Sequence, residues 1–246
     1  MEIKRIPFAV GPYTVHLRTL LSHKRTTIIL VHGLGVSSDY YVKFAQHLAP
    51  FYNVIMIDLP GYGKTPKPEK PLTIPQLAEI LNTYITISQL TDVVAVGQSM
   101  GCQIVAHAAR LSPDLFKKIV LLSPTTNNKE RSVLIQSFRL FQDTFHEPLQ
   151  INLIVFKNYL RMGIRRFIIT SKFMVLHRIE HALTHVSIPV LLVGGSRDKI
   201  VPKRWLKHLV ALTPNARAVE MPTAPHLLQY THPEELTAIT KGFIDA

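Results

Sequence analysis

The sequence predicts an α/β fold in which a mostly parallel sheet of about eight strands is flanked by helices. Two observations predict it. Apolar strand-like runs recur along the chain, and helix-like segments lie between most of them. Because parallel strands need crossover connections, this alternation indicates a parallel sheet that helices cover on both faces. The chain has 246 residues, 47% of them hydrophobic, which is enough for one such domain with a substantial core.

Each element follows from a local pattern. Residues 3–10 and 13–20 are joined around Gly11-Pro12 and predict an antiparallel hairpin at one edge of the sheet. The remaining strands are expected at residues 26–31, 54–58, 93–97, 119–122, 190–194 and 216–221. Helices are expected between them, at residues 38–49, 75–88, 103–111 and 203–212.

One interval, residues 125–186, departs from this rhythm, since it has no clear strand and is helical and aromatic in character. An insert at the carboxyl ends of two parallel strands lies where open α/β sheets bind ligands. We therefore expect residues 1–124 and 187–246 to form the core and residues 125–186 a small helical cap. Three phenylalanines of this cap recur at helical spacing: Phe138, Phe141 and Phe145. We expect them to pack in the cap's own core, and lining of a substrate pocket is the alternative.

A nucleophile motif, Gly97-Gln98-Ser99-Met100-Gly101, joins an apolar strand to a helix. Its serine lies on a sharp strand-to-helix turn, which exposes the hydroxyl. Glycines two residues before and after it let neighbouring backbone approach without a Cβ clash. The N-terminus of the helix offers free N–H groups to developing negative charge. Ser99 is therefore the candidate nucleophile, and a simple tight turn is the alternative interpretation.

A nucleophilic serine needs a base and a carboxylate that orients the base. Asp198 follows the strand at 190–194 and a glycine turn, so we expect it at the carboxyl edge of the sheet. His226 lies in a short loop between the strand at 216–221 and the last helix, which gives the chain order Ser…Asp…His. His232 is the nearby competitor, but it directly precedes a proline and is better explained as a helix-start residue.

The segment His32-Gly33-Leu34-Gly35 follows another apolar strand and is the candidate for an oxyanion loop. The backbone N–H groups of Leu34 and Met100 would point at the same substrate oxygen. Glycines on both sides of Leu34 let the loop fold over a substrate carbonyl. The side chain of His32 is expected to be structural.

Other residues of the chain are alternative candidates for the nucleophile and the carboxylate. Ser123 and Ser196 are the alternative serines, and Asp58 is an alternative carboxylate that we expect to brace loops instead. Cys102 is expected in the core. Because it is the single cysteine, the chain has no internal disulfide framework.

Two motifs resemble cofactor sites. Gly63-Lys64-Thr65 resembles the end of a phosphate loop, but Asp58 occupies the position of its first glycine, and the prolines that follow forbid the required helix. His177-Arg178-Ile179-Glu180-His181 matches a zinc-peptidase pattern. A cap helix with a polar outer face is the simpler interpretation of that match. We expect no metal and no cofactor.

The formal net charge is +12, with basic residues spread along the chain and one partial concentration between Arg131 and Arg178, which includes Arg161, Arg165 and Arg166. We expect a solvated basic face, with contact to an anionic membrane surface as the weaker alternative and no nucleic-acid binding. No apolar run approaches the length of a membrane helix, and the amino terminus does not resemble a signal peptide. A cytoplasmic protein is therefore expected, of an oligomeric state that the sequence leaves open.

Taken in order, these motifs resemble those of α/β-hydrolase-fold serine hydrolases, in the branch of small capped esterases, lipases and carbon–carbon bond hydrolases. The resemblance also covers Asp58-Leu59-Pro60-Gly61-Tyr62-Gly63 and Gly195-Ser196-Arg197-Asp198. The chain departs from the family pattern at Pro225, where members usually have Gly, and at Thr65, where they usually have Ser.

The triad and the resemblance together imply a cofactor-independent hydrolase of carboxylic esters that works through an acyl-enzyme. The apolar cap favours small to medium, mostly apolar substrates. Cleavage of a carbon–carbon bond, opening of a lactone or acyl transfer by the same residues are alternatives. A ligand-binding protein with slow residual hydrolysis is an alternative of another class.

Overall fold

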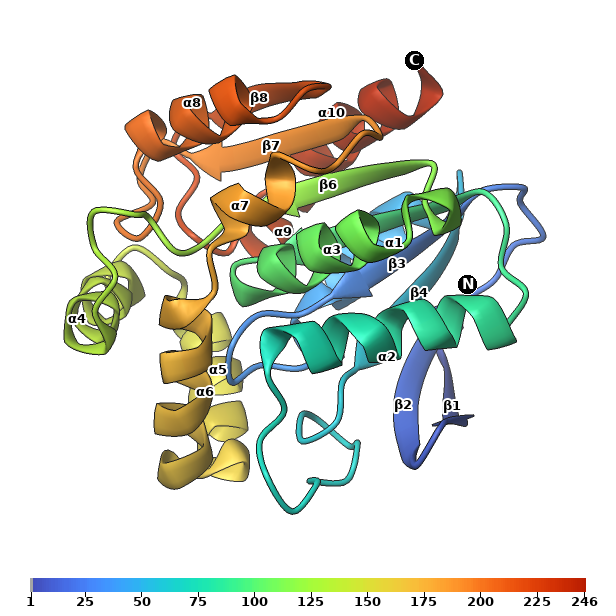
Figure 1. Ribbon diagram of the computed structural model, residues 1–246, viewed down its shortest axis with the longest axis horizontal. Coiled ribbons are helices and arrows are strands. Elements are labelled where there is room, and N and C mark those ends of the chain that lie inside the picture. The colour runs from blue at the N-terminus through green and yellow to red at the C-terminus, as the bar shows by residue number, and fades with distance from the viewer. Residues whose placement is uncertain (1) are drawn as a thin grey trace.

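An eight-stranded sheet runs through the computed structural model, which describes residues 2–246. The strands lie in the order β1-β2-β4-β3-β5-β6-β7-β8 (Figure 1). Strand β2 is antiparallel to β1 and β4, and all pairings from β4 to β8 are parallel. The predicted fold class, including the antiparallel hairpin at one edge, is confirmed.

The strands are β1 (Lys4–Val10), β2 (Tyr13–Leu20), β3 (Thr27–Val31), β4 (Asn53–Asp58), β5 (Val93–Gln98), β6 (Lys118–Leu122), β7 (Val190–Gly195) and β8 (Ala216–Met221). The helices of the first half are α1 (Val42–Leu48), α2 (Ile74–Ile87) and α3 (Met100–Leu111), with short 3₁₀ turns at η1 (Ser38–Tyr41) and η2 (Pro113–Leu115). The later helices are α4 (Val133–Thr144), α5 (Leu149–Met162), α6 (Ile164–Leu176), α7 (Ile179–Leu183), α8 (Lys203–Leu212), α9 (Leu228–Thr231) and α10 (Pro233–Asp245).

The central strands are buried on both faces, as parallel strands between two helix layers must be. Every residue of β3, β5 and β7 is buried, whereas most residues of the edge strand β1 are exposed. The register aligns the carboxyl ends, since Val31 pairs with Gly97 and Gln98 with Leu122. Residues that directly follow these strands therefore meet at one edge of the sheet.

Two helix layers enclose the sheet. Apolar residues of α2, α3, α7 and α8 form one core cluster against one face, and those of α1, α9 and α10 form a second cluster against the other. Helix α7 lies in the first layer, where it packs on α3, although the predicted cap includes it. In space, the helices outside the two layers are α4, α5 and α6.

These three helices connect β6 to β7 and gather at the end of the sheet toward which the strand arrows point (Figure 1). Helix α5 ends at Met162, and the next residue, Gly163, has a φ of +82°, a positive value that suits glycine and lets α6 start directly. Their position at the carboxyl edge places them over the loops that carry the candidate site residues. Across residues 2–246, none of the helices combines the length and the apolar character that crossing a bilayer requires.

Candidate active site

Ser99 lies at the turn between β5 and α3 with φ +54° and ψ −117°, a strained conformation for a residue with a side chain. Its backbone N–H donates to the carbonyl of Leu122 at 2.9 Å, which ties the turn to the neighbouring strand. A Cβ on Gly97 would overlap the backbone of Gly101, and one on Gly101 would overlap the carbonyl of Val31. Close backbone packing therefore requires both glycines, as the motif predicts.

Asp198 and His226 meet at the same edge. The imidazole Nδ1–H of His226 donates to Oδ2 of Asp198 at 2.8 Å. Oδ1 of this carboxylate accepts the backbone N–H groups of Ile200 at 2.7 Å and Val201 at 2.9 Å. Both carboxylate oxygens are engaged, so the plane of Asp198 and the orientation of the imidazole are fixed. Nε2 of His226 is the ring nitrogen left for a hydroxyl in the pocket.

The charges of this pair stabilise each other. Burial alone would raise the pKa of Asp198, but His226 and the backbone donors hold it below its usual value. Burial would lower the pKa of His226, but the charge and hydrogen bond of Asp198 raise it above its usual value, with smaller contributions from Asp143 and Glu147. The site therefore favours an imidazolium, the species that a histidine base becomes when it takes a proton.

The loop after β3 touches the serine turn. A Cβ on Gly33 would lie 3.3 Å from Cβ of Ser99 and 2.8 Å from the side-chain oxygen of Gln98. Among residues 2–246, no acceptor binds the backbone N–H of Leu34 or that of Met100. Both donors are thus free for a ligand, as the oxyanion-loop prediction requires.

A hydrogen-bond chain that the sequence analysis missed links the three loops of the site. The N–H of Gly33 donates to the hydroxyl of Tyr40 at 3.0 Å, and this hydroxyl donates to Oε1 of Gln98 at 3.1 Å. Nε2 of Gln98 then donates to the backbone carbonyl of His226 at 3.3 Å. Tyr40 precedes α1 and lies far from the motifs in sequence, so only the position of Gln98 inside the nucleophile motif hinted at this role.

His32 and Asp58 brace the loops, as expected. His32 is fully buried, its Nε2 accepts the N–H of Leu59 at 3.2 Å, and its ring packs on Tyr62. The carboxylate of Asp58 accepts backbone N–H groups from Ser38 at 2.7 Å and from Lys64 at 3.1 Å. Neither side chain lines the pocket that contains Ser99.

None of the competing residues lines the pocket that contains Ser99. Ser123 is fully buried at the end of β6, and the hydroxyl of Ser196 accepts the N–H of Thr223. His232 is the N-terminal cap of α10, as its position before proline predicts. Cys102 is fully buried in the core, as expected, and this burial raises the pKa of its thiol well above the usual value.

The residues of the zinc-peptidase match are engaged in separate contacts. The carboxylate of Glu180 pairs with Arg131 through both oxygens. Nε2 of His177 lies 3.3 Å from Nδ1 of His107 on α3, and the rings of His181 and His185 are tilted against each other with centroids 5.2 Å apart. Within the described residues, 2–246, no three side chains of the His, Cys, Asp or Glu type converge as a metal site would require.

The prediction for the three cap phenylalanines is wrong. Phe138, Phe141 and Phe145 are 58%, 60% and 75% exposed, so they neither form a cap core nor line the pocket. The opposite face of α4 lines the pocket, through Val133, Gln136, Ser137, Leu140 and Asp143. Both faces of α4 repeat with helical spacing, and periodicity alone does not tell which of two faces turns inward.

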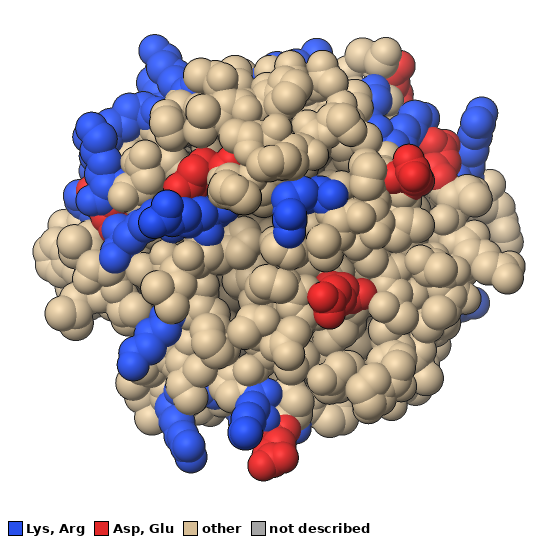
Figure 2. Space-filling model, viewed as in Figure 1, with Lys and Arg blue, Asp and Glu red and all other residues tan. Residues whose placement is uncertain are grey.

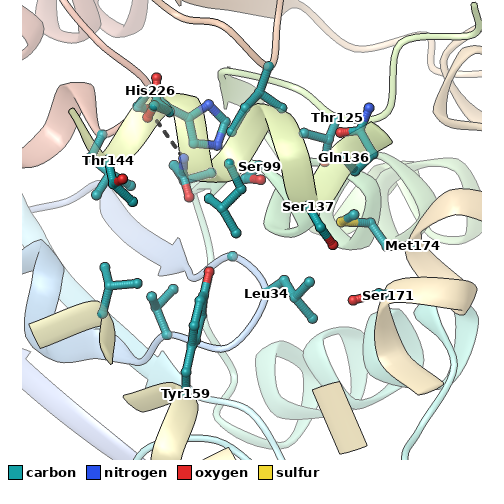
Figure 3. A pocket seen from close by; sticks show the side chains of 18 of the residues that line it. Leu34, Ser99, Thr125, Gln136, Ser137, Thr144, Tyr159, Ser171, Met174 and His226 are labelled. Atoms are coloured by element: carbon teal, nitrogen blue, oxygen red, sulfur yellow. Dashed lines mark hydrogen bonds between the residues drawn. The ribbon is translucent and has the colours of Figure 1, made fainter. Parts of the chain in front are cut away.

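A pocket lies between the sheet edge and these helices. Ser99 and His226 lie at one end of it, Tyr159 reaches in from α5, and Met174 and Ser171 come from α6 (Figure 3). Leu34 lies in the loop that borders the serine (Figure 3). The mainly apolar wall, with a few polar groups near Ser99, is typical of a site for a small organic ligand.

Two acidic residues in the pocket wall escaped the sequence analysis. Asp143 and Glu147 are buried, and one oxygen of each, Oδ1 and Oε2, has no hydrogen-bond partner. Oε1 of Glu147 accepts the N–H of Leu227, the residue after the candidate base, at 2.7 Å. Burial raises the pKa of Asp143 to about 6 and that of Glu147 to about 8. Asp143 lies in the last turn of α4 and Glu147 in the turn that follows it, and their spacing matches no sequence motif.

Residues 26–163, more than half of the chain, match the family model of the alpha/beta hydrolase fold. The chain belongs to the alpha/beta hydrolase fold family. Among its curated relatives is an uncharacterized hydrolase, YugF, of Bacillus subtilis, to which this α/β hydrolase is 28% identical across 96% of each chain. It is 23% identical to a pimeloyl-[acyl-carrier protein] methyl ester esterase of Pectobacterium atrosepticum, over 90% of this chain and 95% of the relative.

The fold of this α/β hydrolase also recurs among solved structures. A membrane phospholipase A described as a bacterial virulence factor superposes with a TM-score of 0.84 at 21% identity, covering 99% of this chain and 86% of that one. An esterase from Thermogutta terrifontis superposes with a TM-score of 0.80 at 18% identity, covering all of this chain and 98% of the other. At these identities the likeness concerns the fold alone.

Proposed function

We propose that this α/β hydrolase cleaves carboxylic esters through an acyl-enzyme formed on Ser99. One observation carries the proposal. The strained turn of Ser99 opens into the same pocket as His226, whose Nδ1 is bound to Asp198 at 2.8 Å. A serine, a histidine and an oriented carboxylate in this relation are the working parts of acyl transfer to water.

In the proposed reaction, Nε2 of His226 takes the hydroxyl proton of Ser99 as its oxygen attacks the acyl carbon of the ester. Asp198 stabilises the resulting imidazolium, and the free N–H groups of Leu34 and Met100 stabilise the oxyanion. The imidazolium then gives its proton to the alcohol oxygen as the carbon–oxygen bond breaks. Water repeats both transfers on the acyl-enzyme, releases the acid and restores the serine.

The substrate is proposed to be small to medium in size and mostly apolar. The pocket wall supports this, since Leu34, Val155, Phe167 and Met174 contribute apolar side chains. We also propose that residues 125–186 act as a cap that selects the substrate, because α4, α5 and α6 supply much of that wall. A relative that is a methyl ester esterase supports ester chemistry over other uses of the same triad.

The test is the replacement Ser99→Ala. We expect loss of covalent labelling by a fluorophosphonate and a fall in hydrolysis of p-nitrophenyl esters by about 10⁵, because members of such a triad act as a unit. Mass spectrometry of the labelled protein identifies the modified residue. Ser196→Ala is the matched control and should keep both the label and the activity.

Labelling at a serine other than Ser99 would contradict the proposal. Turnover on a panel of p-nitrophenyl esters of increasing acyl length separates an enzyme from a ligand-binding protein. A binder would show one burst of product and then almost none, whereas the proposed esterase turns over continuously with a preference set by pocket length.

A further inference from the structure

Helix α5 carries a continuous stripe of exposed apolar side chains. Leu149, Leu153, Phe156 and Leu160 follow one another at intervals of four, three and four residues, and each is at least 60% exposed. Residues at such intervals lie on one side of a helix. Contiguous apolar surface of this kind is rare on soluble monomers and marks a surface that contacts another phase or molecule.

Helices α5 and α6 form a hairpin whose tip extends the stripe. Their inner sides meet where the rings of Tyr159 and Phe167 pack at 5.0 Å, and both residues line the pocket. At the tip, around Gly163, Leu160 and Ile164 are 68% and 74% exposed. The inner side of the hairpin thus belongs to the pocket, while its outer side is apolar and uncovered.

The hairpin is also strongly basic. Residues 149–176 contain five Lys or Arg residues and no Asp or Glu. Four of the five are exposed: Lys157, Arg161, Arg165 and Lys172. Figure 2 shows blue side chains among uncharged surface at the lower left, where Figure 1 places the hairpin. One acid from another loop, Glu69, lines a groove with Arg165, so the surroundings of the tip remain basic.

We propose that the outer face of the α5–α6 hairpin, residues 149–176, docks on an anionic lipid bilayer. An amphipathic helix lies in a membrane interface when apolar side chains enter the acyl boundary and cations meet the anionic headgroups. The exposed stripe supplies the first contact and the four exposed cations supply the second. This docking is independent of the reaction proposed for Ser99.

A nucleic acid or a second copy of this chain is complementary to only one of the two features, the apolar stripe or the exposed cations. A nucleic acid would pair with the cations, but exposed leucine and phenylalanine side chains gain little from its phosphates. A second copy of this chain would cover the apolar stripe, but a symmetric contact would bring two acid-free basic hairpins together. An anionic bilayer is complementary to both features at once.

The binding test uses the full chain with vesicles of phosphatidylcholine alone or mixed in equal parts with phosphatidylglycerol, and measures the sedimented fraction. We expect binding to the anionic vesicles at least tenfold tighter than to the neutral ones. It should weaken strongly in about 1 M NaCl, where charges are screened beyond about 3 Å. Equal binding to both vesicle types, or no binding to either, would overturn the proposal.

Paired variants locate the surface. Phe156→Ser with Leu160→Ser should lower the affinity for anionic vesicles by about tenfold or more, because two side chains lose their place in the acyl boundary. The matched control is Ile87→Ser with Leu111→Ser, which removes exposed apolar side chains from α2 and α3. If the control weakened binding as much as the hairpin variant, the assignment of the surface would be wrong.

A second pair tests the charges. Arg161→Glu with Arg165→Glu should reduce binding to anionic vesicles by about tenfold or more. Lys24→Glu with Lys207→Glu makes the same change of net charge at exposed positions away from the hairpin and should have a much smaller effect. All four variants should hydrolyse a short, water-soluble ester at the unaltered rate, which shows that they fold.

Sedimentation velocity measures the oligomeric state and tests whether this face joins two copies of the chain instead. The protein could be a dimer that does not bind vesicles and that becomes monomeric when Phe156→Ser and Leu160→Ser are introduced. That result would identify this face as a contact between two copies and overturn the lipid proposal. A monomeric protein that binds anionic vesicles supports it.

Discussion

The α/β core and the α4–α6 helices differ in how buried carboxylates are hydrogen-bonded and in how far phenylalanines are exposed. At the sheet edge, the buried carboxylate of Asp198 has hydrogen-bond donors on both oxygens. In α4 and the turn after it, Asp143 and Glu147 are also buried, yet each leaves one oxygen without a partner. Apolar residues differ too, since Phe44 of α1 is fully buried and Phe145 is 75% exposed.

This difference separates two tasks. Where donors fix a carboxylate, it stays charged and holds a histidine in one orientation, which suits chemistry that is the same for every ester. Where a buried carboxyl leaves one oxygen without a donor, desolvation raises its pKa, and its charge depends on pH and on what fills the pocket. In the proposed function, the first region carries out the reaction and the second contacts the substrate.

The largest expected effect concerns the fixed carboxylate. Asp198→Asn should lower kcat/KM for a p-nitrophenyl ester by about 10⁴, because the amide favours the wrong imidazole tautomer. Circular dichroism should show an intact fold. The comparison is Asp58→Asn, at another buried carboxylate that braces loops, which should lower stability but leave the folded protein active. A reversed outcome, with Asp58 essential and Asp198 dispensable, would move the acid of the triad.

The next effect tests the burial of aromatic residues. Phe44→Ala should lower the free energy of unfolding by about 3–5 kcal/mol, because it leaves a cavity in the core between α1 and the sheet. Phe145→Ala should change it by less than about 0.5 kcal/mol, since its ring is mostly in solvent. Urea denaturation measures both. A large loss at Phe145 would mean that the ring is covered in solution.

A smaller effect should come from Glu147. Its pKa is about 8 in the folded protein and near 4.5 in the unfolded chain, so the folded state keeps a proton that the unfolded state has lost over this range. Stability contributed by protonated Glu147 is present below the unfolded pKa and falls as pH rises toward 8. Glu147→Gln removes this dependence and keeps an acceptor for the N–H of Leu227.

The free energy of unfolding of Glu147→Gln, measured relative to the natural protein, should therefore rise between pH 5 and pH 8 by about 3 kcal/mol. The same denaturation series on Glu79→Gln, a surface acid of α2, serves as control and should show no such trend. A difference that stays constant with pH would mean that Glu147 is charged throughout.

The smallest effect concerns the pH profile of hydrolysis. Asp143 is largely ionised at neutral pH and raises the pKa of His226, so Asp143→Asn should lower that pKa. Because neutral His226 is the proposed base, the acid limb of kcat/KM should move to lower pH by a fraction of a unit. Glu147→Gln should move it less, since Glu147 is mostly uncharged there. A shift to higher pH would show that Asp143 does not act through its charge.

The sequence determined the parts of this protein that local chemistry dictates. Alternation of apolar strands with helices predicted the parallel sheet, since each crossover must cover a face. The glycines around Ser99 predicted the turn. A Cβ on Gly97 would overlap the backbone of Gly101, and a Cβ on Gly101 would overlap the carbonyl of Val31. Asp198 and His226 could be singled out because carboxyl ends of parallel strands converge, whatever the rest of the chain does.

Only the tertiary structure decided what the inserted helices do. Helix α4 has two faces of similar periodicity, and packing against the sheet edge turned the face with Asp143 inward and the phenylalanines outward. The bonds from Tyr40 to Gln98 and from Glu147 to Leu227 join residues 58 and 80 positions apart, which no local pattern reports. A motif fixes chemistry over a few residues, whereas the direction in which a helix faces depends on every surface that it meets.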